Sequence, residues 1–586
     1  MKNRNKMLKN FLAVSVISIA GFSFSASVTT VYSAQNESVE LNGFYDGEFV
    51  LSEKPGFHDE PFDLVVSIPT EPNAVIYYTI DGNEPQPDAD RFITRGENRI
   101  QVSGEIPQNG QIKVDDRSGN WKDSILTYHH SEGFKTPVKP VDGTEILQGT
   151  AFRFRGFVDG QPVTETITAT YIVAPDAGTR FANMPVVAIT APYEDFIYIY
   201  SHADPFDNVT HRRIFNYEYF EYSESDYTRI FNLPGSSQLG GTGTRGNSQR
   251  TINVHLSRGE LDGVVTHSVF PGLDELYRFR LWNGGNAFSR DHMRDPFAQT
   301  ASEGLNVLRS DYRLAIKFVN GEFWGFTNLR EHTSNAHFVV TRLGLGSEYN
   351  NIALVSRSWK HVDGKQHFFD EIEEGEEDVV WGLYNEIVEF VKSHDLSTDY
   401  ARERLFSEFF CQENFMDYLI VNTFFDNADW PHNNVRLFRV IEPHLTSSSP
   451  YSDGRWRFIL HDIDSAGVSI GRNRFPSLYR GESHELPFND IFLVFNNRKF
   501  VEQFRERALY VLDNQFQRDR LAALHSEFVV QYLPLLPEMY NRFPIHGNVE
   551  RSMVNFNNNW INLANFLTSR DEHYRSQLDA LLKRVS

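Results

Sequence analysis

Short runs of β-branched and aromatic residues, separated by polar turns, dominate the chain from about residue 38 to residue 173. Four of these runs have the length and composition of strands: 63–69, 74–80, 151–157 and 166–173. The pairs Asp81-Gly82 and Asp159-Gly160 are typical of hairpin turns. Because helical periodicity is absent from this region, the pattern predicts an antiparallel β-sandwich over residues 35–175.

A second strand-rich region follows a break near residues 174–178. Residues 184–189 resemble a buried strand, and strands dominate from there to about residue 345. The run 314–326 is typical of a hairpin around Asn320-Gly321, since both residues of that pair tolerate the positive φ angles of a two-residue turn.

Beyond residue 378 the hydrophobic spacing changes to the three-to-four-residue period of helices. The period recurs over residues 379–391 and again over 405–424, with Cys411 as a small core residue and a helix end near Phe425. Residues 490–586 are also predicted to be mostly helical. A strand-rich lobe followed by a helix-rich lobe is an α+β pattern.

The acidic run 370–378 lies just before the first of these helices. We expect a solvated loop whose carboxylates favour the positive N-terminal end of the helix, although such a run also suits a cation site.

Composition narrows the classes of partner. A length of 586 residues, of which 40% are hydrophobic and 14% aromatic, supports about two to four packed domains. The net charge of −22 repels phosphate backbones and anionic lipid, which excludes a nucleic acid as a partner. Cys411 is the single cysteine, so an intrachain disulfide and a cysteine-based zinc cluster are excluded.

The first 34 residues are expected to be a signal peptide rather than part of the fold. A basic segment that contains Lys2 and Lys9 precedes an apolar stretch, and Tyr32-Ser33-Ala34 suits a cleavage site. An uncleaved anchor is the alternative. No apolar run of about 18 residues occurs after residue 30, so no membrane span is expected once the signal is removed. Export through a Sec-type signal without disulfides suits a bacterial secreted or cell-envelope protein.

The stretch 422–467 contains the residues with the clearest chemistry. Two predicted strands, 435–441 and 456–460, are separated by a polar loop, and the second leads into His461-Asp462-Ile463-Asp464. If the strands pair as a hairpin, the start of the first lies beside the end of the second. The residues that would then converge are Asp429, Asn434, Asp462 and Asp464. Converging carboxylates need a cation or protons between them, and hard oxygen ligands suit Mg²⁺ or Mn²⁺.

Protein kinases use this set of groups for phosphoryl transfer. They need an Asp that accepts the hydroxyl proton, an Asn five residues later on a metal ion, and a second metal-binding Asp after a hairpin. Asp429 and Asn434 have that spacing. As alternatives, these residues are ordinary turn or helix-capping features, or a metal-dependent hydrolase uses the carboxylates with His432 or His461.

A glycine-rich segment, 241–246, matches the pattern G-x-G-x-x-G. A dinucleotide-binding fold requires a helix after this pattern, whereas the following residues here are typical of a strand. A loop of backbone donors over phosphates, followed by a strand that carries a cation, fits better. An ordinary glycine-rich turn is the alternative.

Six pieces of the chain resemble, in order, the CotH kinase family, the atypical kinases first associated with spore coats. These pieces are 184–187, 246–251, 280–286, 320–331, 429–434 and 456–464. The resemblance implies an atypical bilobal protein-kinase-like domain over residues 184–586, with a β-rich lobe followed by a helix-rich lobe. Residues 76–85 resemble the signature of the chitobiase C-terminal-like β-sandwich, in which Tyr77 or Tyr78 would contact a glycan or simply pack on the sheet.

The resemblance to the CotH kinase family also implies ATP with Mg²⁺ or Mn²⁺ as cofactors and a protein Ser or Thr as acceptor. Asp429 would be catalytic, and the metal would be held by Asp462, Asn434 or Asn433, and Asp464. Nucleotide contacts would come from Gly246, Ser248, Arg250, Lys317 and Glu331.

One departure from the family pattern concerns the phosphate-facing lysine. Many members carry Pro-x-Lys-Ser where this chain has Gln249-Arg250-Thr251, so Arg250, or Lys317 on a neighbouring strand, would replace that lysine. The departure also admits a non-catalytic kinase-like surface or matrix protein whose sandwich contacts carbohydrate.

Overall fold

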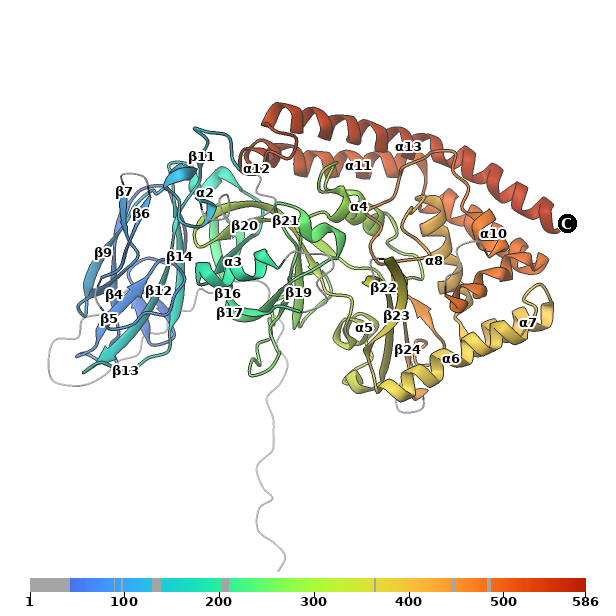
Figure 1. The fold of residues 1–586 in the computed structure, drawn as a ribbon, viewed down its shortest axis with the longest axis horizontal. Coiled ribbons are helices and arrows are strands. Elements are labelled where there is room, and N and C mark those ends of the chain that lie inside the picture. Colours follow the sequence, from blue (N-terminus) through green and yellow to red (C-terminus); the bar gives the residue numbers. More distant parts are fainter. Residues whose placement is uncertain are drawn as a thin grey trace, which may run out of the picture. The chain divides into compact units, whose positions relative to one another are not determined.

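The computed structural model describes residues 43–88, 90–95, 98–128, 139–202, 210–362, 365–443, 449–481 and 486–586 (Figure 1). Residues Gly43–Ser586 form one compact unit. The predicted signal peptide, residues 1–34, lies outside the described residues. In the described part of the chain, no helix is both long enough and apolar enough to cross a membrane.

The N-terminal part is a two-sheet sandwich, as its hydrophobic pattern predicts. One sheet has the order β1-β2-β4-β9: Phe44–Asp46, Phe49–Leu51, Phe62–Ser67 and Gly110–Val114. The other has the order β3-β14-β12-β5-β8: Gly56–His58, Ile167–Val173, Thr150–Val158, Val75–Thr79 and Ser103–Ile106. Leu64 and Val66 of the first sheet share one apolar core with Phe152 and Phe154 of the second. One pair, β3 with β14, is parallel, so the sandwich is not wholly antiparallel.

Tyr77 and Tyr78 lie on β5 and are half-buried. The ring of Tyr77 lies edge-on to Phe157 at 5.4 Å, and that of Tyr78 lies edge-on to Phe152 at 6.0 Å. These contacts agree with the interpretation that both tyrosines pack on the sheet.

Seven strands close into a barrel after the sandwich. Their order is β15-β16-β17-β18-β19-β21-β20: Val186–Thr190, Arg213–Ser223, Asp226–Leu239, Ile252–His255, Arg278–Trp282, Glu322–Glu331 and Tyr312–Val319. The parallel pairing of β15 with β20 closes the barrel, because these strands are the two ends of the strand order. The two strands are more than a hundred residues apart in the sequence. The sequence pattern predicts the strands of this lobe but not their closure.

The hairpin β20–β21 turns at Asn320-Gly321, as predicted. Their φ angles are 49° and 79°, the positive values that a two-residue turn matching the twist of its strands requires. In the barrel wall β21 lies between β19 and β20. It ends at Glu331, where the chain leaves the barrel for the helix-rich part.

A further four-stranded sheet follows the barrel; the sequence predicts its hairpin of strands β24 and β25 but not the pairing with β22 and β23. Its order is β23-β22-β24-β25: Lys365–Glu374, Ile352–Val362, Arg436–Val440 and Arg457–Phe458. The expectation of a solvated loop over residues 370–378 is therefore wrong for its first five residues, which belong to β23. The carboxylate of Asp370 accepts a 2.7 Å hydrogen bond from Arg357 Nε and a second bond from Tyr384, so pairing with β22 compensates the charge that suggested a loop. Glu377 and Asp378 do lie in the first turn of helix α6, as expected.

The helices of the second half match the predicted period, with one interruption. Helices α6 (Glu377–Ser393) and α8 (Gln412–Phe424) are present, and α8 ends where predicted. The run 405–424 is not one helix, because Cys411 N donates to Trp456 O at 3.2 Å and Trp456 N donates to Phe409 O at 2.7 Å. Cys411 N thus bonds to a distant segment instead of within a helix, and Cys411 is buried at the start of α8.

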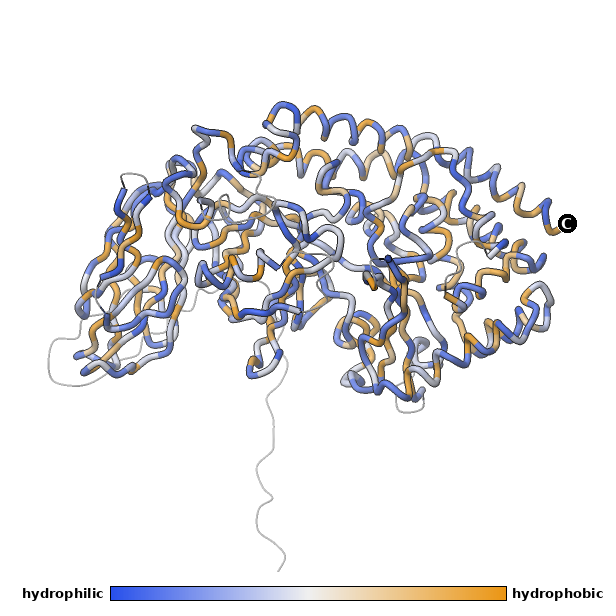
Figure 2. Tube along the Cα trace, viewed as in Figure 1, coloured by the Kyte–Doolittle hydropathy of each residue, from blue (hydrophilic) through white to orange (hydrophobic). Residues whose placement is uncertain are grey.

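Helices α10 (Arg498–Asn514), α11 (Arg518–Tyr532), α12 (Leu536–Arg542) and α13 (Val549–Val585) make up most of the C-terminal hundred residues. Hydrophobic and hydrophilic positions alternate along them (Figure 2). From α13, the fully buried Arg570 donates to Phe424 O and Thr423 O at 2.8 Å and to Ile470 O at 2.6 Å. The guanidinium thus satisfies the last carbonyls of α8, which otherwise have no intrahelical partner.

Replacement of Arg570 by Met is expected to destabilise the fold by about 3 kcal/mol, because several buried carbonyls lose a charged donor at once. Urea denaturation measures this change. Arg575→Met on the same helix is the matched control, since the partly exposed Arg575 pairs with Asp571 and Asp513 at the surface, and its loss is expected to cost less than about 1 kcal/mol. Equal, small effects of both variants would contradict the role of Arg570.

Candidate functional site

The predicted hairpin of residues 435–460 is present and gathers polar side chains at one end of the four-stranded sheet that follows the barrel. Leu437 lies opposite Phe458 in the antiparallel pair β24–β25. As a result, Asn434 Nδ2 lies 3.4 Å from Asp462 O, its hydrogen-bond acceptor, although 28 positions separate the two residues. The same Asn434 nitrogen donates to Asp429 Oδ2 at 3.1 Å, and Asn433 Nδ2 donates to that oxygen at 3.0 Å.

The backbone around this cluster adopts a conformation that most side chains avoid. Asp426, Asn434 and Asp462 have φ angles of 51°, 56° and 48°. Asn and Asp are the residues other than glycine that enter the left-handed region most readily, and such conformations concentrate at functional sites. The carboxylate of Asp426 is held by Arg474 Nε at 2.7 Å and by Ser469 N at 3.1 Å. These turns set the directions of the Asn434 and Asp462 side chains.

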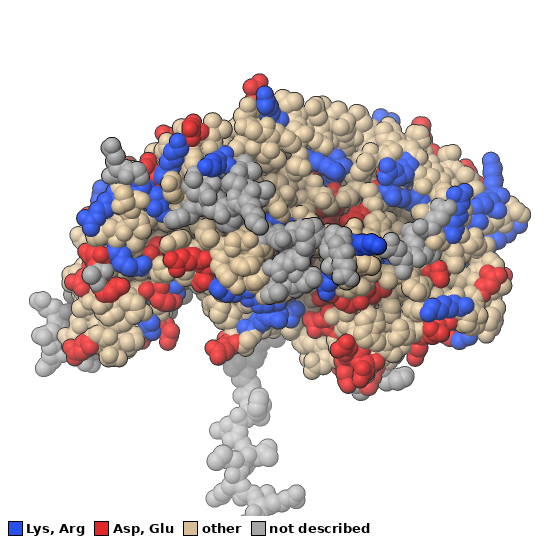
Figure 3. Space-filling view, in the orientation of Figure 1, with Lys and Arg blue, Asp and Glu red and all other residues tan. Residues whose placement is uncertain are grey.

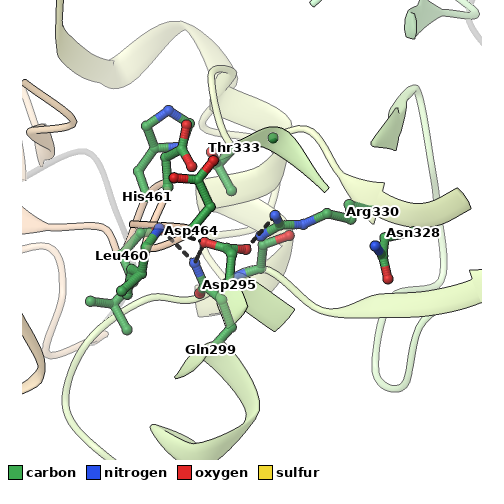
Figure 4. A network of polar contacts seen from close by, with 12 residues as sticks. Asp295, Gln299, Asn328, Arg330, Thr333, Leu460, His461 and Asp464 are labelled. Carbon is green, nitrogen blue, oxygen red and sulfur yellow. Dashed lines mark hydrogen bonds and ion pairs between the residues drawn. The ribbon is translucent and has the colours of Figure 1, made fainter. Parts of the chain in front are cut away.

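Asp464 and Asp295 extend the acidic cluster beyond Asp462 (Figure 4). Asp464 accepts from Asn286 N at 2.6 Å and from Asn286 Nδ2 at 3.0 Å. Asp295 comes from helix α4 (Arg294–Ala301), pairs with Arg330 of the barrel, and accepts from Ile463 N at 2.7 Å. Sequence reasoning missed Asp295, because no local pattern connects it with residues 168 positions later.

Burial and mutual repulsion act on these carboxyl groups together. Burial, and then the charges of Asp464, Asp295 and Asp429, raise the pKa of Asp462 well above its usual range. Burial also raises the pKa of Asp464, although the hydrogen bonds from Asn286 oppose this shift. Asp462 Oδ1 is buried and has no hydrogen-bond partner among the described residues. A cation beside Asp462 would reduce the repulsion among the carboxylates and would give the unpartnered Oδ1 atom an electrostatic partner.

No group of three or more His, Cys, Asp or Glu residues in the described part of the chain is arranged to hold a metal ion by itself. A divalent ion at Asp462 would therefore take its other ligands from amide oxygens, water or a bound phosphate, which is how Mg²⁺ is usually held. The oxygen donors of Asp462, Asp464 and Asn434 fit that mode of binding, since Mg²⁺ prefers oxygen ligands.

Asp429 differs from the other acids because it is accessible. Its side chain is 33% exposed, and His432 Nε2 lies 3.2 Å from its Oδ1. The cluster therefore combines the accessible Asp429 with the buried Asp464 and with Asp462, whose Oδ1 atom is buried. Such an arrangement can take a proton from an incoming group at Asp429 while Asp462 and Asp464 attract a cation.

The glycine-rich loop lies next to the acidic cluster. Residues Gly243–Gly246 form a single 3₁₀ turn, and the following Asn247 donates from Nδ2 to Gly285 O at 3.4 Å. Gly285 directly precedes Asn286, the partner of Asp464. Ser248 is buried, and its hydroxyl has no partner among the described residues. The structure thus brings Gly246 and Ser248 to the neighbourhood of Asp464, although no contact joins them to it.

Glu331, at the end of β21, is buried and already engaged. It accepts from Arg342 Nε at 2.7 Å and from Asp311 N at 2.8 Å. Burial raises the pKa of Glu331, and the ion pair with Arg342 opposes this shift. Its contacts hold helix α5 (Ala336–Leu343) against the barrel at the point where the chain leaves it.

Arg250 and Lys317 do not lie with Asp462. Arg250 is buried, donates to Tyr200 O and, at 3.2 Å, to Asn247 O, and lies over the Tyr200 ring. Lys317 is fully buried on β20, at the register shift between Ile316 and Phe318, which lie opposite Phe326 and Phe323 of β21. Arg330 reaches the acidic cluster through Asp295. It lies about five residues further along β21 than the residues opposite Lys317, a separation of roughly 16 Å along the strand.

These features define the class of protein: an α+β chain with a closed β-barrel, a helix-rich part, and an acidic site built where the two meet. The family model for the CotH kinase protein matches residues 244–574, more than half of the chain. The chain therefore belongs to the CotH kinase family, as its motifs predict. A comparison with curated proteins found no match. The sandwich lies outside the matched residues, so its likeness to the chitobiase C-terminal domain stays a prediction.

Gly285→Ala is expected to disturb the site directly. Gly285 has a φ of 56°, and a Cβ atom there would lie 2.1 Å from Asp464 Oδ2 and 2.9 Å from the Trp282 ring. The substitution is expected to displace Asp464 and to cost about 2 kcal/mol of stability, measured by thermal denaturation. Gly246→Ala is the control, because its Cβ would meet nothing within 4 Å. Indistinguishable melting curves for the two variants would contradict this packing.

Lys317→Met is expected to stabilise the protein. Burial, and then the charge of Arg542, lower the pKa of Lys317 to about 7, and its Nζ has no partner among the described residues. The unfolded chain holds this proton up to pH of about 10. Between pH 7 and 10 the unfolded state therefore binds more protons, so wild-type stability rises with pH in this window and the penalty is greatest below pH 7.

We expect Lys317→Met to raise the free energy of unfolding at pH 7 by about 3 kcal/mol and to flatten its rise between pH 7 and 10. Chemical denaturation across that pH range measures both effects. Lys113→Met, at a site 66% exposed, should change neither. A destabilised Lys317→Met variant would mean that the ammonium has a favourable partner.

Proposed function

We propose that this protein is an exported atypical kinase that transfers the γ-phosphoryl group of ATP to Ser or Thr of a protein, with Mg²⁺ or Mn²⁺. The convergence of Asp429, Asn434 and Asp462 at one end of a hairpin carries the proposal. Phosphoryl transfer needs a proton acceptor and a metal site a few ångströms apart, and family membership favours this reaction over others that use the same groups.

Asp429 is the proposed proton acceptor, because its side chain is 33% exposed, whereas Asp464 is buried and so is the Oδ1 atom of the partly exposed Asp462. The amides of Asn433 and Asn434 hold Asp429 Oδ2, so the proposed proton-accepting oxygen is Oδ1, which lies 3.2 Å from His432 Nε2. Asp462 and the Asn434 carbonyl oxygen are the proposed metal ligands, with Asp464, or Asn433 in place of Asn434, as a further one. A bound Mg²⁺ supplies charge neutralisation at the phosphate oxygens.

Export rests on the sequence alone. The basic and apolar segments of residues 1–34 support secretion or location in the bacterial cell envelope. The acceptor would then be a surface or extracellular protein.

A non-catalytic surface or matrix protein is the second candidate. The specific observation in its favour is that Arg250 and Lys317, the cations expected to face the phosphates, are buried away from Asp462. In this alternative the kinase-like part is a scaffold, and the sandwich contacts glycan through Tyr77 or Tyr78.

The discriminating experiment combines nucleotide binding with phosphoryl transfer. ATP at 100 times its Kd should stabilise the wild type by about 2.7 kcal/mol in the presence of Mn²⁺, measured by thermal shift. Asp462→Asn should lose the Mn²⁺-dependent part of that shift. Asp429→Asn should keep it but lower radiolabel transfer to an acceptor by about 100-fold or more.

Asp579→Asn is the control, since Asp579 is an exposed acid of α13 that pairs with Arg505. It should behave as the wild type in both assays. A wild-type protein without any Mn²⁺-dependent nucleotide shift would favour the scaffold candidate, and transfer that survives Asp429→Asn would refute the assigned role of Asp429.

A further inference from the structure

A pocket opens directly beside Asp462, between the barrel and the helix-rich part. It has about 300 Å³ of empty space, part of it open solvent. Its lining comes from β19, the segment before β20, β21, the segment after β21 and the segment after β25, and it includes Arg280, Trp282, Arg330, Thr333, His461 and Asp462. The pocket therefore shares Asp462 with the proposed metal site.

Arginines concentrate at this pocket although the chain carries a net charge of −22. On the face drawn in Figure 3, by contrast, positive and negative side chains are interspersed. Arg280 and Arg330 are direct neighbours across β19 and β21, and Arg436 reaches His461 Nδ1 at 3.0 Å. Burial, and then the charge of Arg436, lower the pKa of His461 well below its usual range, so this imidazole stays neutral.

Two of the three arginines are already engaged. Arg330 pairs with Asp295 and lies 5.1 Å over the Trp282 ring. Arg436 donates to Thr333 Oγ1 and to His461 Nδ1. Both guanidinium groups therefore have partners that fix their orientation.

Arg280 is different, because only its Nε is bonded. That nitrogen donates to Asn253 Oδ1 at 2.8 Å, and the two terminal nitrogens have no hydrogen bond or ion pair with any described residue. Burial, and then the charges of Arg436 and Arg330, lower the pKa of Arg280 to about 10, so it remains charged at pH 7. A guanidinium held at one nitrogen, with its remaining fork at a pocket wall, is built to receive an oxyanion.

We propose that Arg280 is the phosphate-binding cation of this protein and holds a nucleotide phosphate in the pocket beside Asp462, in place of Arg250 and Lys317. The assignment rests on the proposed function for the identity of the ligand as a nucleotide. A phosphate here would contact the Arg280 fork on one side and lie next to a cation on Asp462 on the other, which places opposite charges around it.

Asp295 positions the two walls of this pocket. Its carboxylate binds Arg330 of β21 and the N–H of Ile463, which follows Asp462. Because Arg280 is the cross-strand neighbour of Arg330, the same carboxylate sets the spacing between the Arg280 strand and the Asp462 segment. Asp295 is thus a positioning residue rather than a ligand.

Calorimetric titration of the full chain with inorganic tripolyphosphate, without metal, tests the assignment of Arg280. Arg280→Gln is expected to weaken binding by about 10- to 100-fold, because a charged two-bond contact is lost. Arg280→Lys keeps the charge but not the fork and should fall between this variant and the wild type. Arg250→Gln is the matched control and should bind within about threefold of the wild type.

Wild-type affinity in Arg280→Gln, equal weakening by Arg250→Gln, or no tripolyphosphate binding by the wild type would overturn the assignment. If Arg280→Gln does not fold, as judged by thermal denaturation, Arg280→Lys decides, and unchanged affinity in that variant counts against the assignment. If tripolyphosphate binding depends on Arg280 but the protein transfers no phosphoryl group, only the kinase proposal is refuted. If Arg280→Gln leaves the rate of phosphoryl transfer unchanged, only the assignment of Arg280 is refuted.

Discussion

The buried carboxylate of Asp295 is the contact on which the site depends. It binds a barrel arginine, Arg330, and a backbone N–H of the acidic segment, Ile463, at the same time. A buried ion pair with a second hydrogen bond tolerates little displacement, because loss of either partner leaves an uncompensated charge in a medium of low polarity. The barrel and the helix-rich part therefore meet with Asp462 and Arg280 lining one pocket.

Around that contact, a cluster of acidic side chains lies beside a cluster of arginines. Burial, and then repulsion by Asp464, Asp295 and Asp429, raises the pKa of Asp462, while burial, and then repulsion by Arg436 and Arg330, lowers the pKa of Arg280. A divalent cation on the acidic side and a phosphate on the basic side would relieve both kinds of repulsion. This complementarity is a physical reason to expect a metal-bound nucleotide, independent of the motif that first suggested one.

Some secondary-structure elements can be predicted from the local sequence pattern, and others cannot. The hairpins at Asn320-Gly321 and between β24 and β25 follow from turn chemistry and alternating hydrophobic positions, which act over a few residues. The acidic run at the end of β23 misled the prediction, because the charge of Asp370 is compensated by Arg357 and its carboxylate also accepts a hydrogen bond from Tyr384, both from elsewhere in the chain. The helix break at residues 410–411 escaped notice because its cause, a bridge to Trp456, lies 45 residues away.

The amino-acid sequence by itself determined the sandwich, the order of strand-rich and helix-rich parts, the family, and the meeting of Asn434 with Asp462, because each depends on local spacing or on one hairpin. Only the tertiary structure decided that the seven strands close into a barrel, that Asp295 joins the acidic cluster, and that Arg280 rather than Arg250 or Lys317 lines the pocket. These features depend on which faces of distant strands and helices pack together. Burial and charge pairing across the whole chain set that packing, and no short stretch of residues encodes it.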